Sequence, residues 1–64
     1  MLYTVETSEG FIAAVRWDDD GQGILDIAYA FREALARTFT AKQVKIVKQY
    51  TQYHSMIIIV KESK

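Results

Sequence analysis

A run of five apolar residues near the C-terminus, residues 56–60, constrains this sequence most. Isoleucine and valine dominate the run, and both favour a pleated strand, so we expect a strand over residues 55–61. Successive side chains of a strand point to opposite faces, which places Ile57 and Ile59 on one face and the other three residues on the opposite one. A strand with one face in water should alternate apolar and polar residues. Both faces of this strand therefore need a cover.

The length of the chain makes that cover important. Its 64 residues include no cysteine and one histidine, so disulfides, thiolate metal sites and His-rich metal sites cannot stabilise it. Half of the residues are hydrophobic, which favours a folded domain over a disordered chain. We expect one α+β domain over residues 1–64 that forms a homo-oligomer, a dimer or higher, with Val47, Ile57 and Ile59 in its interface. The alternative is a central strand whose second face is covered by the chain's own aromatic residues.

Hydrophobic periodicity predicts the order of the elements. Leu2–Thr7 and residues 11–17 flank a Ser-Glu-Gly connection, which is typical of a β-hairpin. Large apolar residues at helical spacing predict one amphipathic helix over residues 24–39. Residues 43–50 and 55–61 predict two further strands. The expected fold is therefore α+β, a two-layer ββαββ arrangement with the helix packed on a small, mainly antiparallel sheet.

The same patterns predict which side chains form the core. In the strand over residues 11–17, alternation assigns to the core Phe11, Ala13, Val15 and Trp17. In the helix over residues 24–39, the apolar stripe consists of Ile24, Ile27, Ala28, Phe31, Leu35 and Phe39.

Charge is divided unevenly along the chain. Residues 1–36 carry seven acids and two bases, a net charge of −5, and residues 37–64 carry six bases and one acid, a net charge of +5. Lysines beside exposed aromatic rings can hold single-stranded nucleic acid by phosphate contact and base stacking. The residues that could do so are Lys42, Lys45, Lys48, Tyr50 and Tyr53. On a strand, however, a spacing of three does not place these lysines on one face, and lysines also protect edge strands against aggregation.

No set of residues predicts catalysis, a metal site or a cofactor site. Residues 18–20 are three aspartates, but a calcium loop of the EF-hand type that begins there would need a bidentate Glu where Tyr29 stands. His54 has no positioned partner, because the adjacent Ser55 would point to the opposite face of a strand. Residues 21–23 lack the further residues of a dinucleotide-binding or P-loop motif. We therefore expect no enzyme, no cofactor and no metal.

These observations favour a small non-enzymatic interaction module that binds a macromolecular partner, such as another protein, in the manner of a regulatory or phage-type accessory protein. The alternative is a nucleic-acid-binding module that uses the basic C-terminal residues. The N-terminus lacks the basic and apolar segments of a signal peptide, and the run over residues 56–60 is too short to cross a bilayer. We therefore expect a cytoplasmic protein with no membrane partner.

Overall fold

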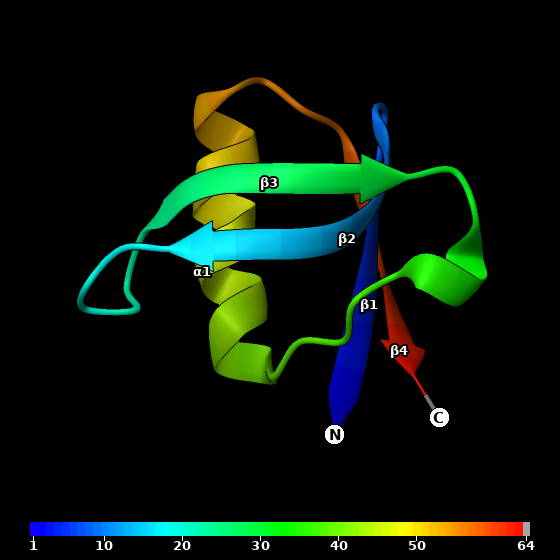
Figure 1. Cartoon of the computed structure of the whole chain (residues 1–64), viewed down its shortest axis with the longest axis horizontal. Coiled ribbons are helices and arrows are strands. Elements are labelled where there is room, and N and C mark those ends of the chain that lie inside the picture. Colours follow the sequence, from blue (N-terminus) through cyan, green and yellow to red (C-terminus); the bar gives the residue numbers. More distant parts are fainter. Residues whose placement is uncertain (64) are drawn as a thin grey trace.

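The computed structural model describes residues 1–63 and shows an α+β fold, in which one α-helix lies against a four-stranded antiparallel sheet (Figure 1). The sheet order is β3-β2-β1-β4, so β3 and β4 are its two edges. Three strands precede the helix and one follows it, so the predicted ββαββ order is wrong although the α+β class is confirmed. The elements are β1 (Leu2–Thr7), β2 (Gly10–Trp17), β3 (Ile24–Ala30), the 3-10 turn η1 (Glu33–Leu35), α1 (Ala41–Tyr53) and β4 (Ile58–Ser63).

The predicted helix over residues 24–39 is wrong, because its first half is strand β3. Two β-bulges interrupt the pairing of β2 with β3, one at Ala13 on β2 and one at Leu25 on β3. A bulge adds a residue to one strand, so residues three apart can point to the same face. Ile24 and Ile27 both pack against the core for this reason. In the sequence, that spacing is indistinguishable from the period of a helix.

The bulge at Ala13 also changes which residues of β2 enter the core. Ile12 is fully buried, and Val15 and Trp17 pack against the core cluster on the same side. The prediction was therefore right for Val15 and Trp17. It was wrong for Ala13, which is the bulge residue, and for Phe11, which precedes the bulge and lies on the opposite face from Ile12.

The single α-helix begins after Thr40, in a segment that we predicted to be a strand. Thr40 and Gln43 form a capping box, in which the Thr40 hydroxyl accepts from the Gln43 N–H at 3.2 Å and the Gln43 side chain accepts from the Thr40 N–H at 2.9 Å. These bonds satisfy backbone donors that a helix start leaves without partners. Val44, Val47 and Thr51 are the buried residues of α1 and follow a helical spacing.

The helix ends in a Schellman motif that uses serine in place of glycine. Ser55 has a φ of 56°, in the left-handed region. Its N–H donates to the Gln52 carbonyl at 3.1 Å, and the Met56 N–H donates to the Thr51 carbonyl at 2.8 Å. The chain can thus reverse from α1 into β4 without a glycine, so the usual sequence sign of a helix end is missing here.

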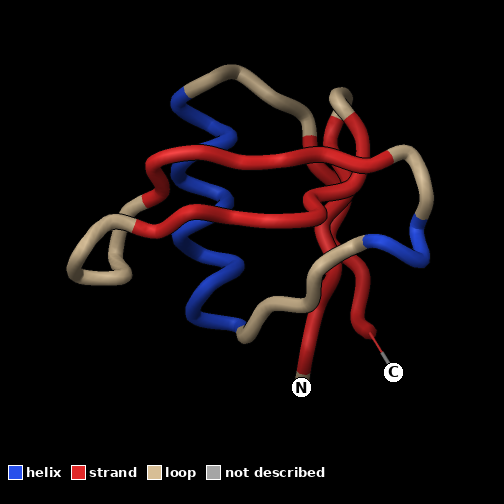
Figure 2. Tube along the Cα trace, in the orientation of Figure 1, coloured by secondary structure: helices blue, strands red, loops and turns tan. Residues whose placement is uncertain are grey.

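Residues 36–39, which we call the strap, lie between β1 and β2. The two strands pair only next to their turn, and Figure 2 shows that β1 and β4 run across β2 and β3. In the space that opens, Phe39 and Tyr3 exchange two backbone hydrogen bonds, and the Arg37 N–H donates to the Ile12 carbonyl at 2.9 Å. The strap thereby closes the sheet and places the Phe39 side chain in the core, where it has no exposed surface.

Candidate interaction surfaces

The two isoleucines predicted on an interface lie exposed at the edge of the sheet. Ile57 is 79% exposed and Ile59 is 54% exposed, whereas Ile58 and Val60 pack against the core on the opposite face. β4 is an edge strand rather than a central one, so the alternative of a central strand is wrong. Val47, the third predicted interface residue, is fully buried in the core, so it offers no surface to another chain.

Ile57 and Ile59 line an open depression on the outer face of the sheet, by which we mean the face opposite α1. The depression has a volume of about 260 Å³, and its other lining residues are Glu6, Thr7 and Ser8. Ile59 lies directly opposite Glu6 on β1. An apolar surface at a strand edge is a common site of pairing with another chain.

The edge formed by β4 is regular. β4 pairs with β1 through six consecutive residue pairs without a register shift. The other edge, β3, carries the bulge at Leu25 and the exposed carboxylate of Asp26. Bulges and charges are the features by which proteins prevent an edge strand from pairing. The two edges therefore differ: β3 is interrupted by a bulge, whereas β4 is regular and its charged residues, Lys61 and Glu62, follow its apolar residues 58–60.

The hydrogen bonds of Tyr3 show which backbone groups of β4 are open. Its N–H and C=O both bond to Phe39, on the side of β1 away from β4. Successive residues of a strand direct these groups to alternate edges. The N–H and C=O groups of Leu2, Thr4 and Glu6 therefore point toward β4. The backbone groups of their partners on β4, which are Ser63, Lys61 and Ile59, point toward β1 in the same way. This leaves the N–H and C=O groups of Ile58 and Val60 at the edge of the sheet.

The helix brings together three lysines that a strand would have separated. Lys42, Lys45 and Lys48 follow each other at intervals of three residues, and on a helix they lie within an arc of about 120°. All three are exposed, and α1 contains no acidic residue. We call these three residues the lysine face. The expectation that they cannot share one face was therefore wrong, because it assumed a strand.

The two tyrosines predicted beside the lysines differ in their exposure. Tyr53 is 85% exposed at the end of α1. Tyr50 is half-buried, and its ring lies 4.4 Å from the ring of His54, centroid to centroid. His54 is exposed and forms the C-cap of the helix. Of the two tyrosines, only Tyr53 is thus freely accessible.

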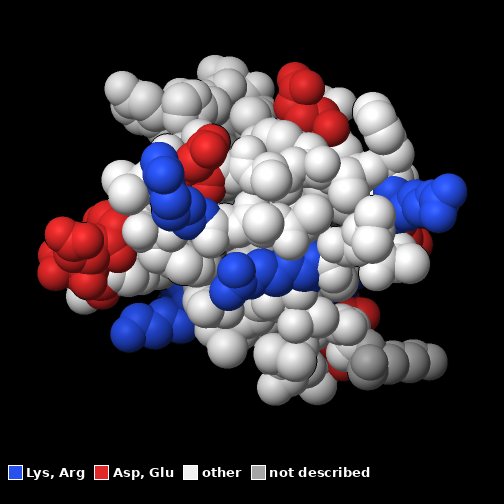
Figure 3. Space-filling view, viewed as in Figure 1, with Lys and Arg blue, Asp and Glu red and all other residues white. Residues whose placement is uncertain are grey.

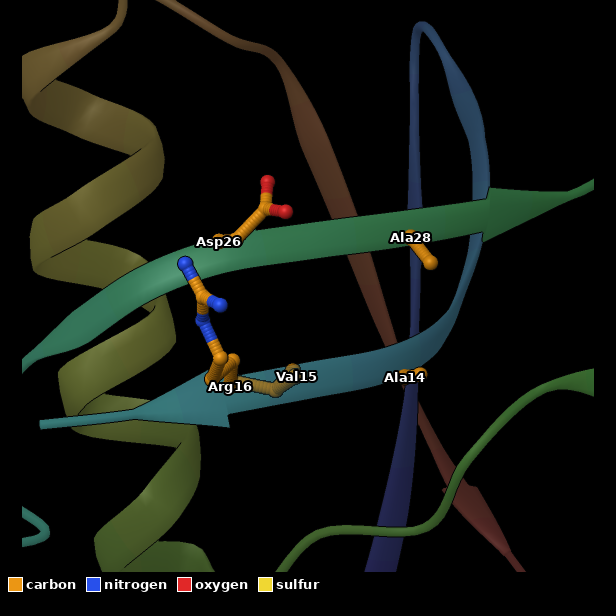
Figure 4. A pocket seen from close by; sticks show the side chains of 5 residues that line it. All are labelled: Ala14, Val15, Arg16, Asp26 and Ala28. Atoms are coloured by element: carbon orange, nitrogen blue, oxygen red, sulfur yellow. The ribbon is translucent and has the colours of Figure 1, made fainter.

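Two further depressions lie on the outer face. The first, of about 230 Å³, lies between β2 and β3, where Arg16 faces Asp26 and Ala14 faces Ala28 (Figure 4). Its lining contains one basic and one acidic side chain beside two alanines and a valine, and it contains no nucleophile or histidine. The second, of about 440 Å³, separates η1 and the strap from the outer face of β1 and β4.

The aspartates over residues 18–20 precede a strand, not the helix that we expected. Asp18 holds the loop through its carboxylate, which accepts from the Gln22 N–H at 3.1 Å. In residues 1–63, no group of three or more His, Cys, Asp or Glu side chains is arranged to hold a metal ion. No helix in the same residues is long and apolar enough to cross a membrane.

Tyr29 has a phenol whose pKa lies above its ordinary value. Burial raises the pKa of its phenol, and the neighbouring Tyr50, Glu9 and Asp26 raise it further. The hydroxyl donates to the Met56 sulfur at 3.5 Å. This contact ties β3 to the segment before β4, so Tyr29 serves the packing of the fold.

Comparisons of the chain with models of protein families, with curated proteins and with solved structures found no match. The function must therefore be argued from the β4 edge and the lysine face.

Proposed function

We propose that this protein is a small interaction module that dimerises by pairing its β4 strand with β4 of a second copy. The observation that carries the proposal is the exposure of Ile57 and Ile59 beside a regular strand edge. A chain of this size has a small core, and edge pairing adds apolar contacts and backbone hydrogen bonds at once. It also covers an apolar, uncharged run that would promote aggregation if it stayed exposed.

The pairing is antiparallel and follows a two-fold axis normal to the sheet. An antiparallel strand pair of two identical copies keeps the same face of both sheets on the same side. The dimer therefore has one continuous sheet that contains the four strands of each copy. Both α1 helices lie on one side of that sheet, and both outer faces lie on the other.

The register that best matches the residues centres the axis on Ile59. Ile59 then lies opposite Ile59 of the second copy, and Ile58 lies opposite Val60 of the second copy. Ile58 and Val60 are the residues whose backbone groups point to the open edge, so they form the hydrogen-bonded pairs. Ile57 meets Lys61 of the second copy, whose aliphatic stem can cover it.

The oligomeric state measured by sedimentation velocity tests the proposal. We expect the wild-type protein to have twice the mass of the chain. Ile59→Lys should reduce it to a monomer, because a charge would face its own copy across the axis. Leu25→Lys is the matched control, since Leu25 is 59% exposed on the other edge, and it should remain a dimer. A monomeric wild-type protein, or equal effects of the two substitutions, would contradict the proposal.

A further inference from the structure

We infer that the dimer binds the phosphate backbone of a double-stranded nucleic acid through its two lysine faces. The inference rests on the proposed dimer, because the two-fold axis places both α1 helices on the same side of the sheet. The dimer thereby combines the three lysines of each copy into one basic surface. The two strands of a duplex are also related by two-fold axes, so one lysine face can meet each strand.

The lysines form a row along α1 with no acid in the helix, and such a row can contact the anionic backbone of a nucleic acid. Steps of three residues advance the lysines by about 4.5 Å along the helix axis. The chain as a whole has no net charge, but seven of its eight acids lie in residues 1–36 and none lies in α1. Figure 3 shows acidic side chains gathered at the left, where Figure 1 places the loop between β2 and β3 with its aspartates at residues 18–20. The positive charge of α1 is thus not neutralised within the helix.

The aromatic residues favour a duplex over a single strand. Proteins that hold single strands stack bases on several exposed rings along a basic groove. Here Tyr53 is exposed, but Tyr50 is half-buried against His54. The lysine face has no row of rings on which bases could stack. Contacts to the backbone of a duplex need no such rings.

The burial of the apolar side of α1 argues against a membrane surface as the partner. A helix that lies in a bilayer interface buries an apolar face in the acyl region. The apolar face of α1 contains Val44 and Val47, and both are buried in the core of this protein. Apart from Ala41 and Tyr53, the exposed residues of the helix are lysines and glutamines.

Fluorescence anisotropy with a labelled DNA duplex of mixed sequence tests the inference, with sedimentation velocity on the same samples. We expect the wild-type dimer to bind in low salt, with the logarithm of the binding constant falling against the logarithm of salt at a slope of up to about −5 for six lysines. The triple substitution Lys42→Gln, Lys45→Gln and Lys48→Gln should abolish binding while the dimer persists, since glutamine retains helix propensity.

Single substitutions sharpen the comparison. Lys45→Gln removes one lysine from each copy and should weaken binding and reduce the salt slope by about 2. Arg32→Gln removes an exposed charge outside α1 and should leave both unchanged. Ile59→Lys should weaken binding although it adds positive charge, because it separates the two lysine faces.

The outcomes separate this inference from the proposed function. A dimer that does not bind the duplex would overturn the inference and leave the dimer intact. A monomeric wild-type protein would overturn both. Equal losses for Lys45→Gln and Arg32→Gln would overturn the assignment of the lysine face. Tighter binding to a single strand, or to anionic phospholipid vesicles, would overturn the assignment of a duplex.

Discussion

Tyr3 and Phe39 are joined by two backbone hydrogen bonds, from the Tyr3 N–H to the Phe39 carbonyl at 2.8 Å and from the Phe39 N–H to the Tyr3 carbonyl at 2.7 Å. This bridge fixes the strap against β1 and places the Phe39 ring in the core. It also determines the direction of the backbone groups along β1, and through the pairing of β1 with β4 it leaves Ile58 and Val60 open at the edge. One contact in the core thus determines which backbone groups the surface offers to a partner.

Phe39 and Phe31 provide a test of the strap. Phe39 has no exposed surface and Phe31 is 95% exposed, although their sequence spacing places both on the stripe of a helix. We expect Phe39→Ala to lower the free energy of unfolding by about 3–5 kcal/mol, because it leaves a cavity in the core. Phe31→Ala should change it by less than about 0.5 kcal/mol. Urea denaturation at one protein concentration measures both, and similar effects of the two substitutions would contradict the position of the strap.

The Schellman motif at the end of α1 predicts a stabilising substitution. Ser55 is the one residue other than glycine with a positive φ in the part of the chain that the structure describes. A residue with a Cβ atom in this conformation costs roughly 1–2 kcal/mol, which glycine avoids. We therefore expect Ser55→Gly to raise the free energy of unfolding by about 1 kcal/mol. Ser8→Gly is the control and should lower it slightly, since Ser8 has no positive φ to relieve. A loss of stability in Ser55→Gly would show that the helix does not end as described.

Tyr29 predicts a dependence of stability on alkaline pH. Its folded pKa lies above the ordinary value of 10.0, so the folded state favours the neutral phenol more than the unfolded state does. The stabilisation that results from this difference is fully present below pH 10 and is lost as pH rises through the folded pKa. We expect Tyr29→Phe to reduce the fall of stability above pH 10. Tyr53→Phe, which removes an exposed phenol, is the control, and equal pH profiles for the two variants would contradict the partial burial of the Tyr29 phenol.

The sequence predicted three of the four strands. Leu2–Thr7 is a strand as expected, the strand predicted over residues 11–17 begins one residue earlier at Gly10, and the last strand lies within a few residues of its predicted range. The helix over residues 24–39 was wrong because the bulge at Leu25 gives β3 a spacing of three residues between its core side chains Ile24 and Ile27. Bulges depend on the pairing of distant strands, and a local pattern does not show them.

The strand predicted over residues 43–50 failed for a different reason. Its valines and isoleucine favour a strand by local propensity. A helix forms because the capping box at Thr40 starts it and the valines fit its buried face. Tertiary packing therefore decides against local propensity. The same change brings the lysines onto one face, so the candidate surface could be recognised only once the helix was known.

Disulfide formation by Ile59→Cys tests the pairing of two β4 strands most directly. The chain has no cysteine of its own, so the substitution adds one thiol to each copy. In the proposed register the two thiols face each other in a non-hydrogen-bonded pair, with Cα atoms about 4.5 Å apart, which a disulfide can span. We predict rapid formation of a linked dimer under mild oxidation in native buffer, and little in Leu25→Cys. A variant Ile59→Cys that stays unlinked, or links no faster than Leu25→Cys, would contradict the dimer.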